Sequence, residues 1–192
     1  MLSRYLNRCM AIRYTIITAV ILFFLILLIP AEWKIIYRHL HNNKDYQTII
    51  IPVFGISHQT IENTYGAPRP GGRKHQGIDI FAPRGTPVLN AVEGIILYTG
   101  RDTYGGNVVR ILGRDKRIYY YAHLHSYNDF EPGEKVYQGD VIGYVGNTGN
   151  AITTPPHLHF EIMEIRGLLP LRIGNVNPYD ELVRAENGLI VQ

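Results

Sequence analysis

The sequence predicts an all-β domain that is preceded by one N-terminal transmembrane helix. From residue 48 onward, short runs rich in β-branched and aromatic residues alternate with glycine and proline, which is typical of strands joined by turns. No long segment after Trp33 keeps the period of a helix. The 192 residues are enough for one domain with a substantial core and a shorter appendage.

The appendage is the apolar segment from Tyr14 to Trp33. It carries no charged residue between Tyr14 and Ile29, and as a helix it would be about 30 Å long, which matches the hydrocarbon core of a bilayer. Arginines alone carry charge in residues 1–13, so the positive-inside rule places that end in the cytoplasm and the rest of the chain outside. We interpret 14–33 as an uncleaved signal-anchor. A cleaved signal peptide is the alternative, although the apolar core is long and no clear small-x-small cleavage site follows it.

Charge and cysteine content narrow the class of the external part. Three of the 19 lysines and arginines precede the apolar run and all 16 acidic residues follow it, which leaves 16 basic against 16 acidic residues outside. A formally neutral domain gives no electrostatic case for nucleic-acid binding. The single cysteine, Cys9, lies on the predicted cytoplasmic side, so no intrachain disulfide stabilises the domain.

The chain after the apolar segment begins with a polar, irregular linker over residues 34–50. Strands are predicted at Ile49–Val53, Pro87–Tyr98, Asn107–Leu112, Ile118–Leu124, Lys135–Tyr137, Val141–Val145 and His157–Ile165. Glycines at 105, 106 and 113 lie between strand-like runs and predict hairpin or bulge turns.

Two short clusters supply metal-ligating side chains. Successive side chains of an extended strand alternate between faces, so His75 and Asp79 point the same way, and so do His157 and His159. Two such strands can present four polar groups to one groove. Imidazole nitrogen and carboxylate oxygen suit Zn²⁺, and three protein ligands with a fourth position open to water are typical of a catalytic zinc site.

Four stretches of the chain carry longer, ordered motifs. They are Arg73–Val88, which includes His75-Gln-Gly-Ile-Asp79, then Tyr121-Ala-His-Leu124, Gly146-Asn-Thr-Gly149 and Pro156-His-Leu-His-Phe-Glu161. Together they resemble the lysostaphin/LytM-type zinc metallo-endopeptidases, from about Ile51 to about Tyr179. The resemblance implies an antiparallel β-sheet groove of the duplicated-hybrid-motif type over residues 51–180, with 181–192 as a C-terminal tail. It also implies hydrolysis of peptide bonds in bacterial peptidoglycan.

The resemblance further implies a role for each histidine. One zinc ion per chain would be bound by His75, Asp79 and His159, while His123 and His157 would be catalytic residues that line the groove without binding the metal. No His-Glu-x-x-His helix is present, so the glutamate base of other zinc peptidases is missing. One of the two non-ligand histidines is therefore expected to transfer protons, and the sequence leaves open which one.

Four further polar residues lie in or beside the motifs. Arg69 or Arg73 could pair with a substrate carboxylate, or could belong to a solvated loop. His125 lies two residues after His123, on the same face of a regular strand, and is interpreted as a rim residue. Glu161 could hold a ligand imidazole from outside, or be an ordinary exposed strand residue.

The expected location is the outer side of a bacterial inner membrane, with the N-terminal helix as a single-pass anchor and a peptidoglycan peptide as the substrate. One alternative is a non-catalytic regulator of cell-wall hydrolases, which the intact histidine set argues against. Another is a β-sandwich adaptor module, suggested by the hairpin at Pro132–Gly143, but that hairpin has no modifiable lysine at its tip. The sequence decides neither the bond that is cut nor the oligomeric state.

Overall fold

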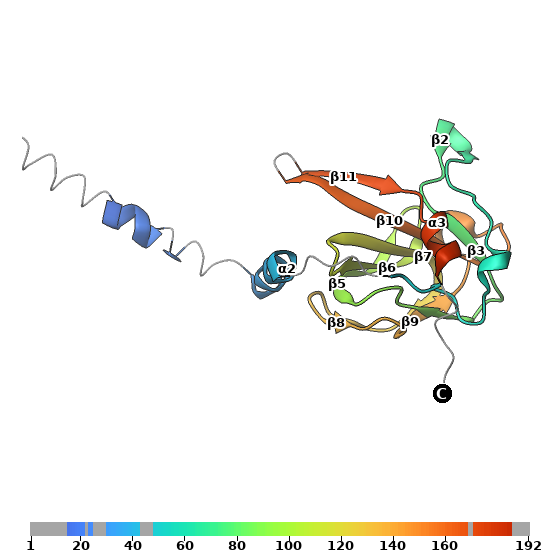
Figure 1. Cartoon of the computed structure of the whole chain (residues 1–192), viewed down its shortest axis with the longest axis horizontal. Coiled ribbons are helices and arrows are strands. Elements are labelled where there is room, and N and C mark those ends of the chain that lie inside the picture. The colour runs from blue at the N-terminus through green and yellow to red at the C-terminus, as the bar shows by residue number, and fades with distance from the viewer. Residues whose placement is uncertain (1–14, 22, 25–29, 43–47, 169–170, 186–192) are drawn as a thin grey trace, which may run out of the picture.

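The computed structural model describes residues 15–21, 23–24, 30–42, 48–168 and 171–185 (Figure 1). Residues 15–21 and 23–24 are helical, and helix α2 (Ala31–Asn42) follows Pro30. None of the helices in these ranges combines the length and the apolar character needed to cross a bilayer. Residues 14, 22 and 25–29 of the predicted span lie outside the described residues.

Nine strands of the described chain form one antiparallel sheet (Figure 1). They are β3 (Ile78–Phe81), β4 (Pro87–Leu89), β5 (Gly94–Asp102), β6 (Gly106–Gly113), β7 (Arg117–Tyr127), β8 (Lys135–Val136), β9 (Val141–Val145), β10 (His157–Leu168) and β11 (Leu171–Val176). The main order is β11-β10-β7-β6-β5-β8; in addition, β3 pairs with the first half of β10, while β9 pairs with both β4 and the end of β7. The predicted β-rich domain is confirmed.

The remaining elements are short. A separate hairpin of β1 (Pro68–Arg69) and β2 (Arg73–Lys74) projects beyond the sheet in Figure 1, and its turn contains the 3₁₀ segment η2 (Pro70–Gly72). Two more 3₁₀ turns are η1 (His58–Thr60) and η3 (Gly149–Ala151), and the last helix is α3 (Tyr179–Arg184).

Several predicted elements differ from the structure. The predicted strand 87–98 is two strands, β4 and β5, because buried Asn90 makes a turn in which its Oδ1 accepts a hydrogen bond from the Val92 amide. Residues 49–53 run beside β4 but form only a single bridge, Val53 with Val88; Pro52 has no amide hydrogen to continue a ladder. Part of the linker predicted as irregular is helix α2.

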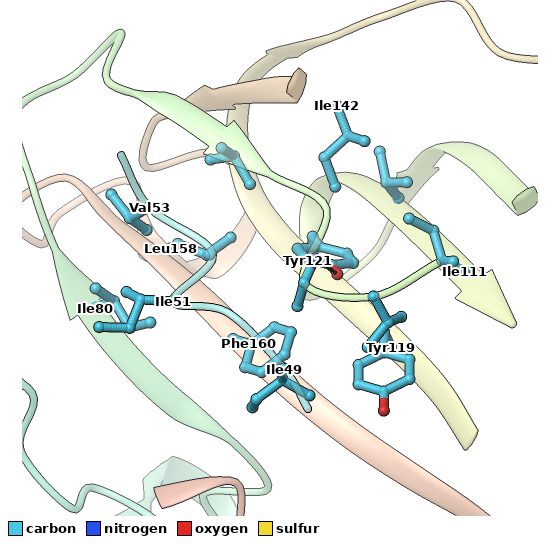
Figure 2. Packing of buried hydrophobic residues seen from close by; sticks show 14 of the residues in the cluster. Ile49, Ile51, Val53, Ile80, Ile111, Tyr119, Tyr121, Ile142, Leu158 and Phe160 are labelled. Atoms are coloured by element: carbon cyan, nitrogen blue, oxygen red, sulfur yellow. Dashed lines mark hydrogen bonds between the residues drawn. The ribbon is translucent and has the colours of Figure 1, made fainter. Parts of the chain in front are cut away.

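The core lies on one face of the β7–β10 pair, because the side chains of both strands alternate. Tyr119 and Tyr121 of β7 and Leu158, Phe160 and Ile162 of β10 are fully buried in it. Figure 2 shows Ile49, Ile51 and Val53 packing beside Leu158 and Phe160, so the segment before the first motif contributes alternate residues to the core. Burying one side chain of this size stabilises the fold by about 1.5–3 kcal/mol. The opposite face of β10 carries His157, His159 and Glu161.

The C-terminal helix α3 closes the core. Leu182 is fully buried, and Arg117 at the start of β7 makes two hydrogen bonds to the Glu181 carboxylate, of 2.6 and 2.9 Å. A buried guanidinium that is paired in this way keeps its charge compensated, and it fixes the helix to the sheet. The packed domain therefore extends past the predicted boundary at residue 180.

Candidate metal centre and its flanking histidines

Three side chains from the predicted metal set meet on the outer face of the sheet. The Nε2 atom of His75 lies 2.8 Å from Nδ1 of His159 and 3.0 Å from Oδ1 of Asp79. The same Asp79 oxygen lies 2.9 Å from Nδ1 of His159. The three atoms thus form a nearly equilateral triangle, and no other group of three metal-ligating residues is found in the described chain.

The register of β3 and β10 creates this triangle. Asp79 lies directly opposite His159 in the antiparallel ladder, so their side chains leave the same face side by side. His75 precedes β3, and its backbone is held by the hydrogen bond from its amide to the Ala67 carbonyl. Between them, Gly77 passes so close to β10 that a Cβ there would lie 2.3 Å from the Phe160 oxygen. Only glycine allows this close approach, which brings His75 over the strand pair.

His75 and His159 each make one hydrogen bond on the side away from the triangle, and this bond determines which ring nitrogen carries the proton. Nδ1 of His75 lies 2.7 Å from the Thr64 carbonyl oxygen, so this nitrogen carries the proton and donates it. Nε2 of His159 lies 2.8 Å from Oε1 of Glu161, so this nitrogen carries the proton in His159. When both rings are neutral, Nε2 of His75 and Nδ1 of His159 therefore present lone pairs to each other and to the Asp79 carboxylate. Three converging lone pairs repel unless a proton or a metal cation lies between them.

The close approach of these side chains shifts the pKa values of His159 and Asp79. Burial opposes the charged form of His159, but Asp79 and Glu161 outweigh it and raise the pKa of His159 to about 9. Burial likewise opposes the charge of Asp79, yet its close contacts with the imidazoles of His159 and His75 hold the pKa of its carboxyl well below its usual range. A buried carboxylate that stays ionised between two imidazoles is the charge distribution that a divalent cation needs.

His157 and His123 lie beside the triangle. Nε2 of His157 is 3.8 Å from Oδ1 of Asp79, and its Nδ1 donates to the Pro155 carbonyl at 2.8 Å. The ring of His123 lies 5.0 Å from that of His157 and 5.7 Å from that of His159, between ring centroids. Its Nδ1 donates to the Thr148 carbonyl at 2.8 Å. Both histidines are almost completely buried.

His123 reaches this face through a β-bulge. Val109 pairs with Tyr121 and Asn107 with Leu124, so Ala122 and His123 together oppose the single residue Val108. His123 has a φ of 62°, and its amide donates to the Gly105 carbonyl at 2.8 Å. Burial, together with the neighbouring His159 and His157, lowers the pKa of His123 to about 4. This side chain is therefore neutral at neutral pH.

The bulge also changes the position of His125. Leu124 turns into the core, and His125 is exposed, with its Nδ1 3.2 Å from Nη1 of Arg84. The prediction that His125 shares the strand face of His123 is therefore wrong, whereas its interpretation as a rim or surface residue agrees with its exposure.

Two arginines of the β1–β2 hairpin are engaged within the protein. The Arg69 guanidinium forms an ion pair with Oδ2 of Asp79, and Arg73 lies 4.4 Å above the ring of Tyr104. Arg69 is therefore a partner of a metal-site carboxylate, a contact that sequence reasoning missed. Glu161 holds His159 from outside, and its other oxygen accepts a hydrogen bond of 2.7 Å from Asn175. Asn175 and the Thr64, Thr148 and Pro155 carbonyls were also missed, because backbone oxygens have no sequence signature.

Comparisons with known proteins agree with this geometry. A model of peptidase family M23 matches residues 73–178. The DD-carboxypeptidase/endopeptidase Mpg of Neisseria meningitidis serogroup B is 40% identical over 116 residues, which are 60% of this chain and 26% of that protein. The L-Ala–D-Glu endopeptidase of Bacillus subtilis is 35% identical over 113 residues, which are 55% of this chain and 35% of that protein. The chain spans about a quarter to a third of the length of these two curated relatives.

Solved structures show the same fold. The crystal structure of LytM from Ruminococcus gnavus matches with a TM-score of 0.62 and 31% identity, over 80% of this chain and 64% of that one. Lysostaphin from Staphylococcus simulans matches with a TM-score of 0.53 and 31% identity, over 71% of this chain and 57% of that one.

The protein combines an antiparallel β-sheet with candidate His, Asp and His metal ligands on the outer face of that sheet. This combination defines its class, a metallopeptidase with a β-rich fold. Because the family model covers more than half of the chain, the chain belongs to peptidase family M23, the family of lysostaphin-like and LytM-like enzymes.

Proposed function

We propose that the chain is a membrane-anchored zinc endopeptidase that hydrolyses peptide bonds in peptidoglycan. The observation that carries the proposal is the triangle of His75, Asp79 and His159, in which one nitrogen of each imidazole and one carboxylate oxygen lie 2.8 to 3.0 Å from one another. Family membership supports the reaction class.

The donor set fits zinc. Two imidazole nitrogens and one carboxylate oxygen are borderline ligands of the kind that zinc prefers, and three of them leave a fourth position for water or substrate. A zinc ion held by these three residues would act as a Lewis acid that polarises a peptide carbonyl and makes water a stronger acid. Glu161 and the Thr64 carbonyl hold the two imidazoles in the tautomers that binding requires.

His123 and His157 supply the proton transfer that the missing glutamate provides elsewhere. Each donates Nδ1–H to a backbone carbonyl, so Nε2 of each is an acceptor fixed in position. The low pKa of His123 keeps it neutral at neutral pH, so it can accept a proton from water at the start of the reaction. Either histidine, once protonated, can donate to the developing oxyanion or to the leaving amine. We assign His123 and His157 this shared role.

The location and substrate follow from the rest of the chain. We infer that residues 14–33 anchor the chain in the inner membrane with the domain outside, residues 1–13 in the cytoplasm and 34–50 as the tether. The two relatives are named for different peptide bonds, one for DD-peptides and one for L-Ala–D-Glu, so a peptidoglycan peptide is the common substrate class. Groups beside the metal, rather than the ligands, then determine which bond is cut.

The test is metal content together with digestion of cell-wall peptides. The full chain, purified in detergent, should contain about one zinc per molecule by elemental analysis. Purified peptidoglycan should yield new peptide ends, identified by mass spectrometry of the released muropeptides. A chelator should stop the cleavage, and added zinc should restore it. Stoichiometric zinc without any new peptide end, or cleavage that resists the chelator, would contradict the proposal.

A further inference from the structure

One cationic side chain at the edge of the site has no acidic partner. Arg84 lies in the exposed loop that follows β3, three residues after Phe81. No carboxylate of the described residues lies within 4.0 Å of its guanidinium nitrogens, whereas several other arginines of the domain are paired with one.

Two side chains from other segments, Asn147 and His125, hold this guanidinium in place. Its Nη2 donates to the Asn147 side-chain oxygen, and its Nη1 lies 3.2 Å from Nδ1 of His125. Since an arginine nitrogen can only donate, Nδ1 of His125 is the acceptor in this contact. The guanidinium has more N–H donors than these two contacts use. Arg84 is therefore both oriented and able to bind a further acceptor.

The residues next to Arg84, Asn147 and His125 connect these three side chains to the candidate metal centre. The ring of Phe81 lies 5.2 Å from that of His157, and Phe81 is 55% exposed. The Gly85 amide next to Arg84 donates to the Val145 carbonyl, and Gly146 pairs with His157. A series of neighbouring rings thus runs from His75 through the site to Phe81, and Arg84 follows Phe81 by three residues in the chain.

We propose that Arg84, oriented by Asn147 and His125, is a subsite that binds a free carboxylate of the peptide substrate on the His157 side of the metal centre. A planar guanidinium binds a carboxylate through two parallel hydrogen bonds, which gives direction as well as charge. Exposed Phe81, whose ring lies beside that of His157, provides an apolar surface near the reacting bond. The subsite makes the enzyme select peptides with an acidic group near the bond that is cut.

This inference rests on the proposed function, because it assumes that the groove receives a peptide. It deepens that function by naming a chemical feature of the substrate and the residue that recognises it. Arg69, the other arginine close to the site, does not compete for this role because it is paired with Asp79.

The experiment compares two forms of one synthetic stem-peptide dimer, with its carboxylates free and with all of them converted to carboxamides. Both are tested on the full chain and on Arg84→Gln. Arg84→Gln should raise KM for the free dimer about 5- to 20-fold while kcat changes less than about twofold, because a charge-assisted pair is lost. The amidated dimer should show the same KM with both proteins. Amidating each carboxylate separately then identifies the one that Arg84 binds.

Binding without turnover separates this inference from the proposed function. Calorimetry on His123→Ala and on His123→Ala with Arg84→Gln should show the same selective loss of affinity for the free dimer, even if no cleavage occurs. Arg172→Gln is the matched control, since Arg172 is an exposed arginine of β11, whose hairpin with β10 extends away from β3 in Figure 1. Arg84→Lys should restore part of the affinity. Equal weakening of both dimers by Arg84→Gln, or no weakening of either, would overturn the subsite.

Discussion

Two regions of the sheet bring histidines to the same site in different ways. In the β3–β10 pair, regular alternation and a direct cross-strand pair place Asp79 beside His159. In β7, a bulge with a φ of 62° at His123 turns that side chain away from the face that alternation would give it. The first region follows from strand periodicity. The second depends on backbone contacts with the neighbouring turns at Gly105 and Thr148.

The two regions also differ in what surrounds the imidazoles. The candidate metal ligand His159 lies between two carboxylates, Asp79 and Glu161, and its pKa is raised to about 9. His123 has a backbone carbonyl as its partner, and its pKa is lowered to about 4. The negative surroundings suit a residue that binds a cation, whereas burial and two neighbouring imidazoles favour the neutral form of His123, whose free nitrogen can accept a hydrogen bond. The difference predicts that mutations in the two regions have separable effects.

The largest effect is expected in the β3–β10 region. His159→Ala should abolish zinc binding and all peptidase activity, because the two remaining ligands, His75 and Asp79, rarely hold zinc alone. Elemental analysis and zinc calorimetry measure the loss, and the full chain is the reference. His125→Ala is the control for zinc content alone, since it removes an exposed histidine that is outside the triangle but contacts Arg84. Stoichiometric zinc in His159→Ala would mean that the triangle is not the metal site.

A smaller but still severe effect is expected in β7. His123→Ala should keep zinc at about one ion per chain and lose about 10²- to 10⁴-fold in kcat, the usual scale for a proton-transfer or oxyanion group. Zinc content and steady-state cleavage of the stem-peptide dimer measure the two quantities on the same preparation. If His123→Ala lost its zinc, or kept full activity, the separation between the two regions would be wrong.

Strand periodicity and turn residues predicted much of the fold, but they did not predict the β7 bulge. The prediction for Val141–Val145 matches β9, and His157–Ile165 lies within β10, because both segments have apolar residues next to glycine or proline turns. The β7 bulge was not predicted, since it results from a hydrogen bond to Gly105 and the packing of Leu124. The three metal donors came from spacing and family motifs; the backbone carbonyls that fix their tautomers could come only from the structure.

The smallest predicted effect tests the two regions without removing any functional group. Gly77 and Gly146 are each closely packed against one of them. A Cβ at Gly77 would lie 2.3 Å from the Phe160 oxygen and 3.0 Å from Cε1 of His159, whereas a Cβ at Gly146 would lie 2.3 Å from the His125 amide nitrogen and 2.8 Å from the His123 oxygen. Because the neighbouring atoms include backbone, either alanine must displace it, at a cost of about 1–3 kcal/mol in stability.

The two substitutions should cost similar amounts of stability but should impair different functions. Gly77→Ala shifts β10 at a ligand, so zinc affinity should fall about 10-fold, as for other changes beside a metal ligand. Gly146→Ala shifts the segment that holds His123 and the bridge to His157, so kcat should fall about 10-fold while zinc affinity stays unchanged. Zinc calorimetry and kinetics at saturating zinc separate the two, with thermal unfolding to confirm that both variants fold. If both alanines changed the same quantity, the metal centre and the flanking histidines would respond as one rigid unit.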